Sequence, residues 1–166
     1  MAKRPLTLGE IRLAQDIFGA ALPYDRVRFS DGAGGNPAAM AAFRNGNTAI
    51  TLRRTVYFAP RRFRPDFTLG TAQDQELFAH EMTHVWQYAR LGFTRFMLRY
   101  ARELASVRFH APALYRYQAG VTRFAEAKLE AQAQMAGEYL QATLEGQETW
   151  KAAIGRSLAG STLYRL

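Results

Sequence analysis

The stretch LFAHEMTHVWQYARLGF, residues 77–93, is the part of the sequence that most strongly indicates the fold. Residues 73–90 contain neither proline nor glycine, and their apolar side chains recur at helical spacing. This pattern predicts a long amphipathic helix that ends near Gly92, since glycine is common just after a helix end. His80 and His84 are four residues apart, so a helix places both on one face, where their imidazoles can reach one metal ion.

Glu81 follows the first histidine and lies slightly around the helix from both. There it is poorly placed to bind the same ion, but it can reach a water molecule on that ion. Zinc lowers the pKa of such a water and polarises a substrate carbonyl. We therefore predict a zinc site at His80 and His84, with Glu81 as the base that activates zinc-bound water for peptide-bond hydrolysis. The competing interpretation is two ordinary histidines on a half-buried helix.

The composition restricts what else can hold the ion. The chain has 166 residues and no cysteine, which excludes thiolate ligands, disulfides and thiol nucleophiles. A catalytic zinc usually has three protein ligands. The metzincin pattern is excluded because Gln87 and Arg90 stand where it needs glycine and histidine. The remaining candidates for the third ligand are Glu103, Glu126, Glu130, Glu138 and His110.

Among these candidates Glu130 has the most suitable surroundings. It lies in a predicted helix beside Leu129, Ala131 and Ala133, and small neighbours allow that helix to pack closely on the histidine helix. Acidic residues among alanines are equally often solvated, so spacing alone leaves the choice open.

The flanking sequence predicts an α+β fold, mainly helical, in a single domain covering residues 1–166. Thr7 and Glu10 have the spacing of a capping box and begin the first helix. Residues 24–60 resemble short strands and turns, including strands at 48–52 and 55–58. They form a small N-terminal β-sheet ahead of the HExxH helix.

Beyond the motif the pattern is helical. A second helix is predicted over residues 93–109 and ends before Pro112. A third is predicted over residues 123–144, which are rich in good helix formers. Residues 155–166 carry no clear signal and are expected to fray.

The net charge and the N-terminal sequence indicate where the protein is located and what it can bind. The formal charge is +8 and the pI about 10.2, a balance that can attract nucleic acid. The sequence contains no recognised nucleic-acid motif, so we rank that partner last. No signal peptide and no membrane-spanning stretch is apparent. These features predict a soluble, cytoplasmic protein, with any export independent of a cleaved signal.

The quoted stretch also resembles a known group of proteins. With the preceding segments AFRNGNTAITL and TVYF, it is similar to the zincin-like HExxH metallopeptidase domains of bacterial "Vgr-related" proteins, which are associated with contractile injection systems. The group's HExxHxxQ pattern corresponds to His80, Glu81, His84 and Gln87. The segment YRYQAGVTRFAEAKLEAQAQMAGEYL resembles its closing helix and implies Glu130 as the third ligand. The resemblance implies a zincin-like fold, a peptide or protein substrate, and a secretion-system spike as partner.

Several further residues are candidates for supporting the predicted site. Gln87 lies on nearly the same helix face as the histidines and either binds a ligand side chain or forms a polar rim. Three side chains are candidates for stabilising an oxyanion: Tyr115, Tyr117 and His110. An edge strand within residues 48–58 would pair with an extended peptide.

Three functions remain in competition. The first is a zinc metallopeptidase with a gluzincin-like site of His80, His84 and Glu130. The second is a non-catalytic, zinc-stabilised adaptor or cargo module of a secretion spike. The third is a basic surface that binds polyanions, with the HEMTH match incidental.

Overall fold

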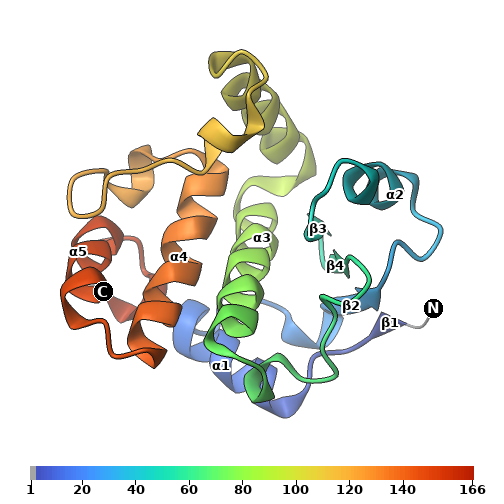
Figure 1. Cartoon of the computed structure of the whole chain (residues 1–166), viewed down its shortest axis with the longest axis horizontal. Coiled ribbons are helices and arrows are strands. Elements are labelled where there is room, and N and C mark those ends of the chain that lie inside the picture. Colours follow the sequence, from blue (N-terminus) through green and yellow to red (C-terminus); the bar gives the residue numbers. More distant parts are fainter. Residues whose placement is uncertain (1–2) are drawn as a thin grey trace.

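The computed structural model describes residues 3–166 and has the α+β architecture that the sequence predicts, mainly helical with one small sheet (Figure 1). The α-helices of the described residues are α1 (Leu8–Phe18), α2 (Pro37–Arg44), α3 (Ala72–Ser106), α4 (Leu129–Leu144) and α5 (Glu148–Leu158). Its strands are β1 (Lys3–Arg4), β2 (Arg28–Asp31), β3 (Ala49–Leu52) and β4 (Thr55–Phe58). Short 3-10 turns connect several of these elements.

The sheet has the strand order β1-β2-β4-β3, so β3 is an edge strand. β2 and β4 are parallel, whereas β3 and β4 form an antiparallel hairpin in which Leu52 pairs with Thr55. The two strands predicted over residues 48–58 are therefore confirmed within one residue. β3 contacts α3, so one end of the open edge lies beside the HEMTH segment.

Helix α2 was not predicted, because residues 24–60 were interpreted as strands and turns. The Asn36 side chain caps the helix by accepting from the N–H groups of Ala38 and Ala39. Pro37 takes the first helical position, where its missing N–H costs no hydrogen bond. The cap and the following alanines are local signals for this helix.

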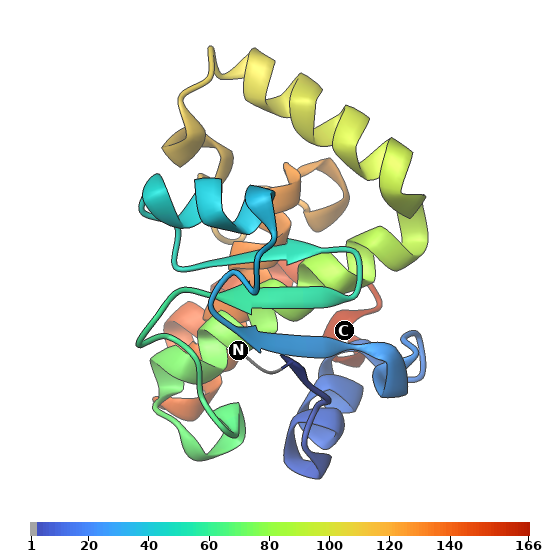
Figure 2. The same ribbon diagram turned by 90° about the vertical axis from the view of Figure 1, so that its right-hand side faces the viewer.

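Helix α3 changes direction at Gly92, whose φ of 73° and ψ of 164° are not helical. Glycine adopts a positive φ without the steric penalty of a side chain. The part of α3 after the kink, residues 93–106, is hereafter called the arm, and Figure 2 shows it crossing the top of the molecule at an angle to the first part. The two predicted helices thus exist, with Gly92 as their boundary.

The C-terminal region is more ordered than predicted. Helix α4 begins at Leu129 rather than at residue 123, and the expectation of a fraying tail is wrong, since α5 covers Glu148–Leu158. Leu158 and Leu163 are fully buried. Apolar contacts therefore hold this tail against the rest of the fold.

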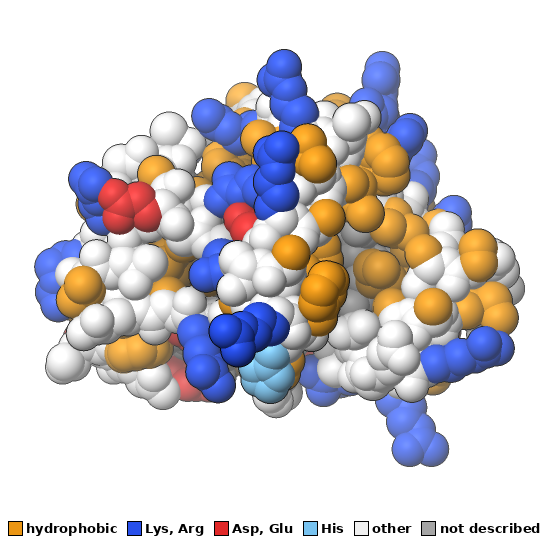
Figure 3. Space-filling view, turned by 90° about the horizontal axis from the view of Figure 1, so that it is seen from above, with side chains coloured by type: hydrophobic (Ala, Val, Ile, Leu, Met, Phe, Trp, Pro, Cys, Tyr) orange, Lys and Arg blue, Asp and Glu red, His pale blue; other side chains and the backbone are white. Residues whose placement is uncertain are grey.

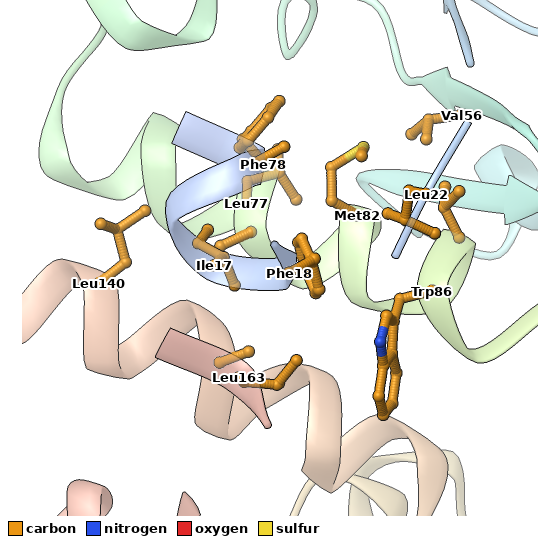
Figure 4. Close-up of a cluster of buried hydrophobic side chains, with 14 of the residues drawn as sticks. Ile17, Phe18, Leu22, Val56, Leu77, Phe78, Met82, Trp86, Leu140 and Leu163 are labelled. Atoms are coloured by element: carbon orange, nitrogen blue, oxygen red, sulfur yellow. The ribbon is translucent and has the colours of Figure 1, made fainter. Parts of the chain in front are cut away.

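One large apolar core joins α1, the first part of α3, α4 and one face of the sheet. Figure 4 shows Ile17 and Phe18 of α1 close to Leu77, Phe78 and Met82 of α3. This packing fixes one face of α3 against the core and leaves the face with the histidines towards α4 and β3. Among the described helices, none combines the length and the apolar character needed to cross a membrane.

Candidate metal centre

Two helices bring the predicted ligands together. His80 and His84 occupy successive turns of α3, with ring centroids 5.0 Å apart, and Glu130 lies in the first turn of α4. Its Oε2 atom lies 3.3 Å from Nε2 of His80 and 3.1 Å from Nε2 of His84. All three side chains are buried, and one potential ligand atom from each lies within 4.8 Å of the others.

The approach of α4 to α3 depends on small residues. Gly137 is so close to α3 that a Cβ atom on it would lie 2.9 Å from the backbone oxygen of Glu76. Ala133, one turn closer to Glu130, is completely buried. The expectation that small neighbours let this helix pack closely on the HEMTH helix is therefore confirmed.

We expect Gly137→Ala to destabilise the protein, although alanine is the better helix former by about 1 kcal/mol. Overpacking against a backbone oxygen costs about 1–3 kcal/mol, so after the gain in helix propensity the net loss in the free energy of unfolding is up to about 2 kcal/mol. Urea unfolding measures it. Gly155→Ala is the control, because its Cβ would meet only Tyr139 Cε2, at an ordinary 3.5 Å. A gain in stability of Gly137→Ala as large as that of Gly155→Ala would contradict the close packing.

A chain of buried amides fixes the orientation of His84. Nε2 of Gln132 donates to the Phe124 carbonyl over 2.8 Å, so its Oε1 is the acceptor for Gln87. Gln87 Nε2 donates to that oxygen and to the Leu129 carbonyl. Oε1 of Gln87 therefore faces Nδ1 of His84, at 2.8 Å, and must accept its proton. Gln87 is 1% exposed and so supports a candidate ligand, which excludes the alternative of a polar rim.

This hydrogen bond has a consequence for the metal. With Nδ1 protonated, a neutral His84 presents the lone pair of Nε2 to the carboxylate of Glu130. Two acceptors facing each other at 3.1 Å need a cation or a proton between them. Two imidazole nitrogens and one carboxylate oxygen are a donor set typical of catalytic zinc, and the residues present fit that ion.

The pKa shifts of His84 and Glu130 also favour a positive charge between these two side chains. Burial alone would lower the pKa of His84, but the charge and hydrogen bond of Glu130 raise it to about 9. Burial alone would raise the pKa of Glu130, but His84 and His80 hold it far below its ordinary value. The carboxylate is therefore ionised and ready to bind a cation.

Glu81 is buried beside this cluster without belonging to it. Its Oε2 accepts a 2.7 Å hydrogen bond from Oγ1 of Thr51 on β3. Thr51 leaves no local signal in the sequence, because its contact with Glu81 joins residues 30 positions apart. Strand β3 thus holds the carboxylate in place, as a general base requires.

The other candidate ligands lie elsewhere. Glu103 accepts from the N–H of Leu129, Glu126 pairs with Arg123 on the surface, and Glu138 accepts from Tyr117 and Gln134. His110 is exposed ahead of a 3-10 turn. Within residues 3–166, the ligand group therefore contains Glu130 and none of the alternatives.

Tyr115 is the one candidate oxyanion donor that the structure places at the site. Its ring lies nearly parallel to that of His80, with centroids 5.9 Å apart. Burial and the nearby Glu130 raise the pKa of Tyr115 far above its ordinary value, so its hydroxyl keeps the proton needed for donation. Tyr117 instead bonds to Glu138.

These groups line a cleft that is open to solvent. One wall is β3 with Asn47 before it, and the opposite wall carries apolar and aromatic side chains of α3. Their helical spacing alone predicts no role at the site. Those side chains are Tyr88, Phe96, Met97 and Tyr100. Seen from above, apolar side chains gather around a hollow in the surface (Figure 3). The kink at Gly92 places the arm over the site and so creates this wall.

Comparisons with known proteins find similarity to a family of domains and to a secretion-system spike protein. Residues 8–92 match the family described as "eCIS core domain". The type VI secretion system spike protein VgrG2b of Pseudomonas aeruginosa is 35% identical over 88 residues, covering 52% of this chain but 8% of that protein. The solved effector domain of VgrG2b is similar in structure, with a TM-score of 0.65 and 26% identity, covering 96% of this chain and 83% of that chain. The chain thus spans a small part of the spike protein and most of its effector domain.

Proposed function

The chain belongs to the eCIS core domain family, and on that premise we propose that it is a module of contractile injection machinery that acts as a zinc-dependent, zincin-like metallopeptidase. The observation that carries the enzymatic part is the buried group of His80, His84 and Glu130 with Glu81 held beside it. The similarity to VgrG2b supports an association with a secretion spike more directly than it supports hydrolysis.

Zinc bound at this site would supply a Lewis acid that polarises a carbonyl oxygen and lowers the pKa of water. Glu81 takes a proton from the attacking water and transfers it to the leaving amine. Thr51 holds the carboxylate of Glu81 so that it points into the cleft. Tyr115 donates its hydroxyl proton in a hydrogen bond to the developing oxyanion.

The edge strand β3 provides a means of binding the substrate. Within residues 3–166 no strand pairs with its outer backbone groups, because β3 is the last strand of the sheet. An extended peptide can add to such an edge by main-chain hydrogen bonds, which give affinity with little demand on sequence. The aromatic wall opposite would hold an apolar side chain near the bond that is cleaved.

The proposal is tested by incubating the zinc-loaded protein with an unfolded polypeptide and following new N-termini by mass spectrometry. We expect cleavage that stops when a chelator removes the zinc and returns when zinc is restored. Cleavage that is indifferent to the chelator would contradict a metal-dependent site.

The alternative is a non-catalytic adaptor or cargo module of the spike, in which zinc only stabilises the fold. The comparisons favour this alternative as far as the spike association is concerned. Its zinc site would be closed by a fourth protein ligand, as structural sites are. The described residues offer three ligands beside an open cleft, and this arrangement is our reason for preferring the enzyme.

A further inference from the structure

A second hollow adjoins the cleft. Leu52 and Tyr88 line both, so the two hollows meet at these residues near the end of β3. Beyond these two residues the hollow is bordered by Arg26, Arg53 and Arg54, and none of the described residues that line it is acidic. Arginines therefore border the hollow that adjoins the cleft of the candidate metal centre.

The three arginines differ from those used to hold the fold together. Elsewhere Arg4 pairs with Glu10 at 2.7 Å and Arg64 pairs with Asp74 at 3.0 Å. Within residues 3–166, Arg26, Arg53 and Arg54 form no ion pair. Guanidinium groups gathered in a depression without counter-charge create a positive potential that attracts anions.

Arg53 occupies a backbone position that favours glycine. It begins the two-residue turn between β3 and β4 and has a φ of 59°. Its guanidinium lies over the Phe93 ring of the arm, 4.6 Å from the centroid, which holds the charge at the hollow.

The position of β3 indicates that a bound peptide would pass the arginines. A peptide paired with this edge would run past Thr51, the partner of Glu81, and then reach the turn at Arg53 and Arg54. Strand residues advance about 3.3 Å each, so the arginines lie roughly two to four residues from the cleaved bond. Arginine pairs with carboxylates through two parallel hydrogen bonds.

We propose that this arginine hollow, formed by Arg26, Arg53 and Arg54, binds acidic side chains of a polypeptide substrate a few residues from the cleaved bond. The inference rests on the proposed peptidase function for the identity of the bound chain. Nucleic acid is also anionic, but the free edge of β3 pairs with a peptide backbone and offers a polynucleotide nothing equivalent.

The test measures binding, so that it does not depend on turnover. Zinc-loaded Glu81→Gln protein is titrated with two fluorescent 12-residue peptides of equal apolar content, one with Asp and Glu at several positions and one with Asn and Gln there. We expect the acidic peptide to bind about tenfold more tightly at low salt, with the difference shrinking as sodium chloride is added. Equal affinities would overturn the proposal.

Variants at the arginines show which residues cause the preference for the acidic peptide. Arg53→Gly combined with Arg54→Ser should remove it and leave the affinity for the neutral peptide unchanged. Glycine suits the φ of 59°, so thermal unfolding should show no loss of stability and thereby exclude misfolding. Arg12→Ala removes one charge from an exposed position on α1 and should leave the preference for the acidic peptide unchanged. A loss in Arg12→Ala of about half the size seen in the double variant would show that only net charge matters and would overturn the proposal.

Two further outcomes separate this inference from the peptidase proposal. If wild type cleaves unfolded protein but shows no acidic preference, the hollow alone is misassigned. If the acidic preference is present without cleavage, the hollow is supported and the peptidase proposal fails. A single-stranded oligonucleotide that displaces the acidic peptide at equal concentration would overturn the assignment to a polypeptide.

Discussion

Glu81→Gln should abolish peptide hydrolysis and leave zinc bound. The three candidate ligands are untouched by this change, because Glu81 lies outside their group and bonds to Thr51 instead. The glutamine oxygen can still accept from the Thr51 hydroxyl, so the strand contact survives. What disappears is the ability to take a proton, and loss of general acid–base catalysis costs about 10²- to 10⁴-fold in rate.

The measurement is cleavage rate together with zinc content of the same preparation. Glu126→Gln is the matched control, since it also neutralises one carboxylate but on an exposed turn where Glu126 pairs with Arg123. It should retain full activity. Undiminished cleavage in Glu81→Gln would remove Glu81 from the mechanism, and loss of zinc would show that the residue binds the ion after all.

Local spacing made much of this site predictable. The positions of His80, Glu81 and His84 follow from the helix period alone, since residues four apart share a face. Turn-forming and strand-forming residues located the strands β3 and β4, and a glycine marked the boundary at Gly92. Each of these features is decided within about ten residues of chain.

What the sequence did not reveal depends on contacts between distant segments. Spacing left five candidates for the third ligand, and it is the packing of α4 on α3 that selects Glu130. The support of Glu81 by Thr51 joins a strand to a helix. The amide chain from Gln87 ends at the Phe124 carbonyl, whose position depends on a 3-10 turn. Periodicity contains no information about such pairs.

The site and the fold have a common origin in the α3–α4 interface. The small residues that allow the close approach also bring Glu130 to the histidines. The amide chain that orients His84 crosses the same interface through Gln87 and Gln132. A change that separates the two helices should therefore weaken zinc binding without touching a ligand.

His84→Ala should remove the zinc. Wild type should carry about one zinc per chain by mass spectrometry, and the variant almost none, because one imidazole and one carboxylate make a weak site. His110→Ala is the control, since His110 is exposed and outside the ligand group, and its zinc content should equal that of wild type. Circular dichroism verifies that each variant remains folded.

Gln87→Leu should give an intermediate result that tests the orientation of His84 separately. It keeps all three ligands and removes the acceptor for Nδ1, so zinc affinity should fall by about 10- to 100-fold. If Gln87→Leu binds zinc like wild type, the amide chain does not orient the ligand. If His84→Ala retains the full zinc content, the ion is held elsewhere, and the helix would then present two ordinary histidines.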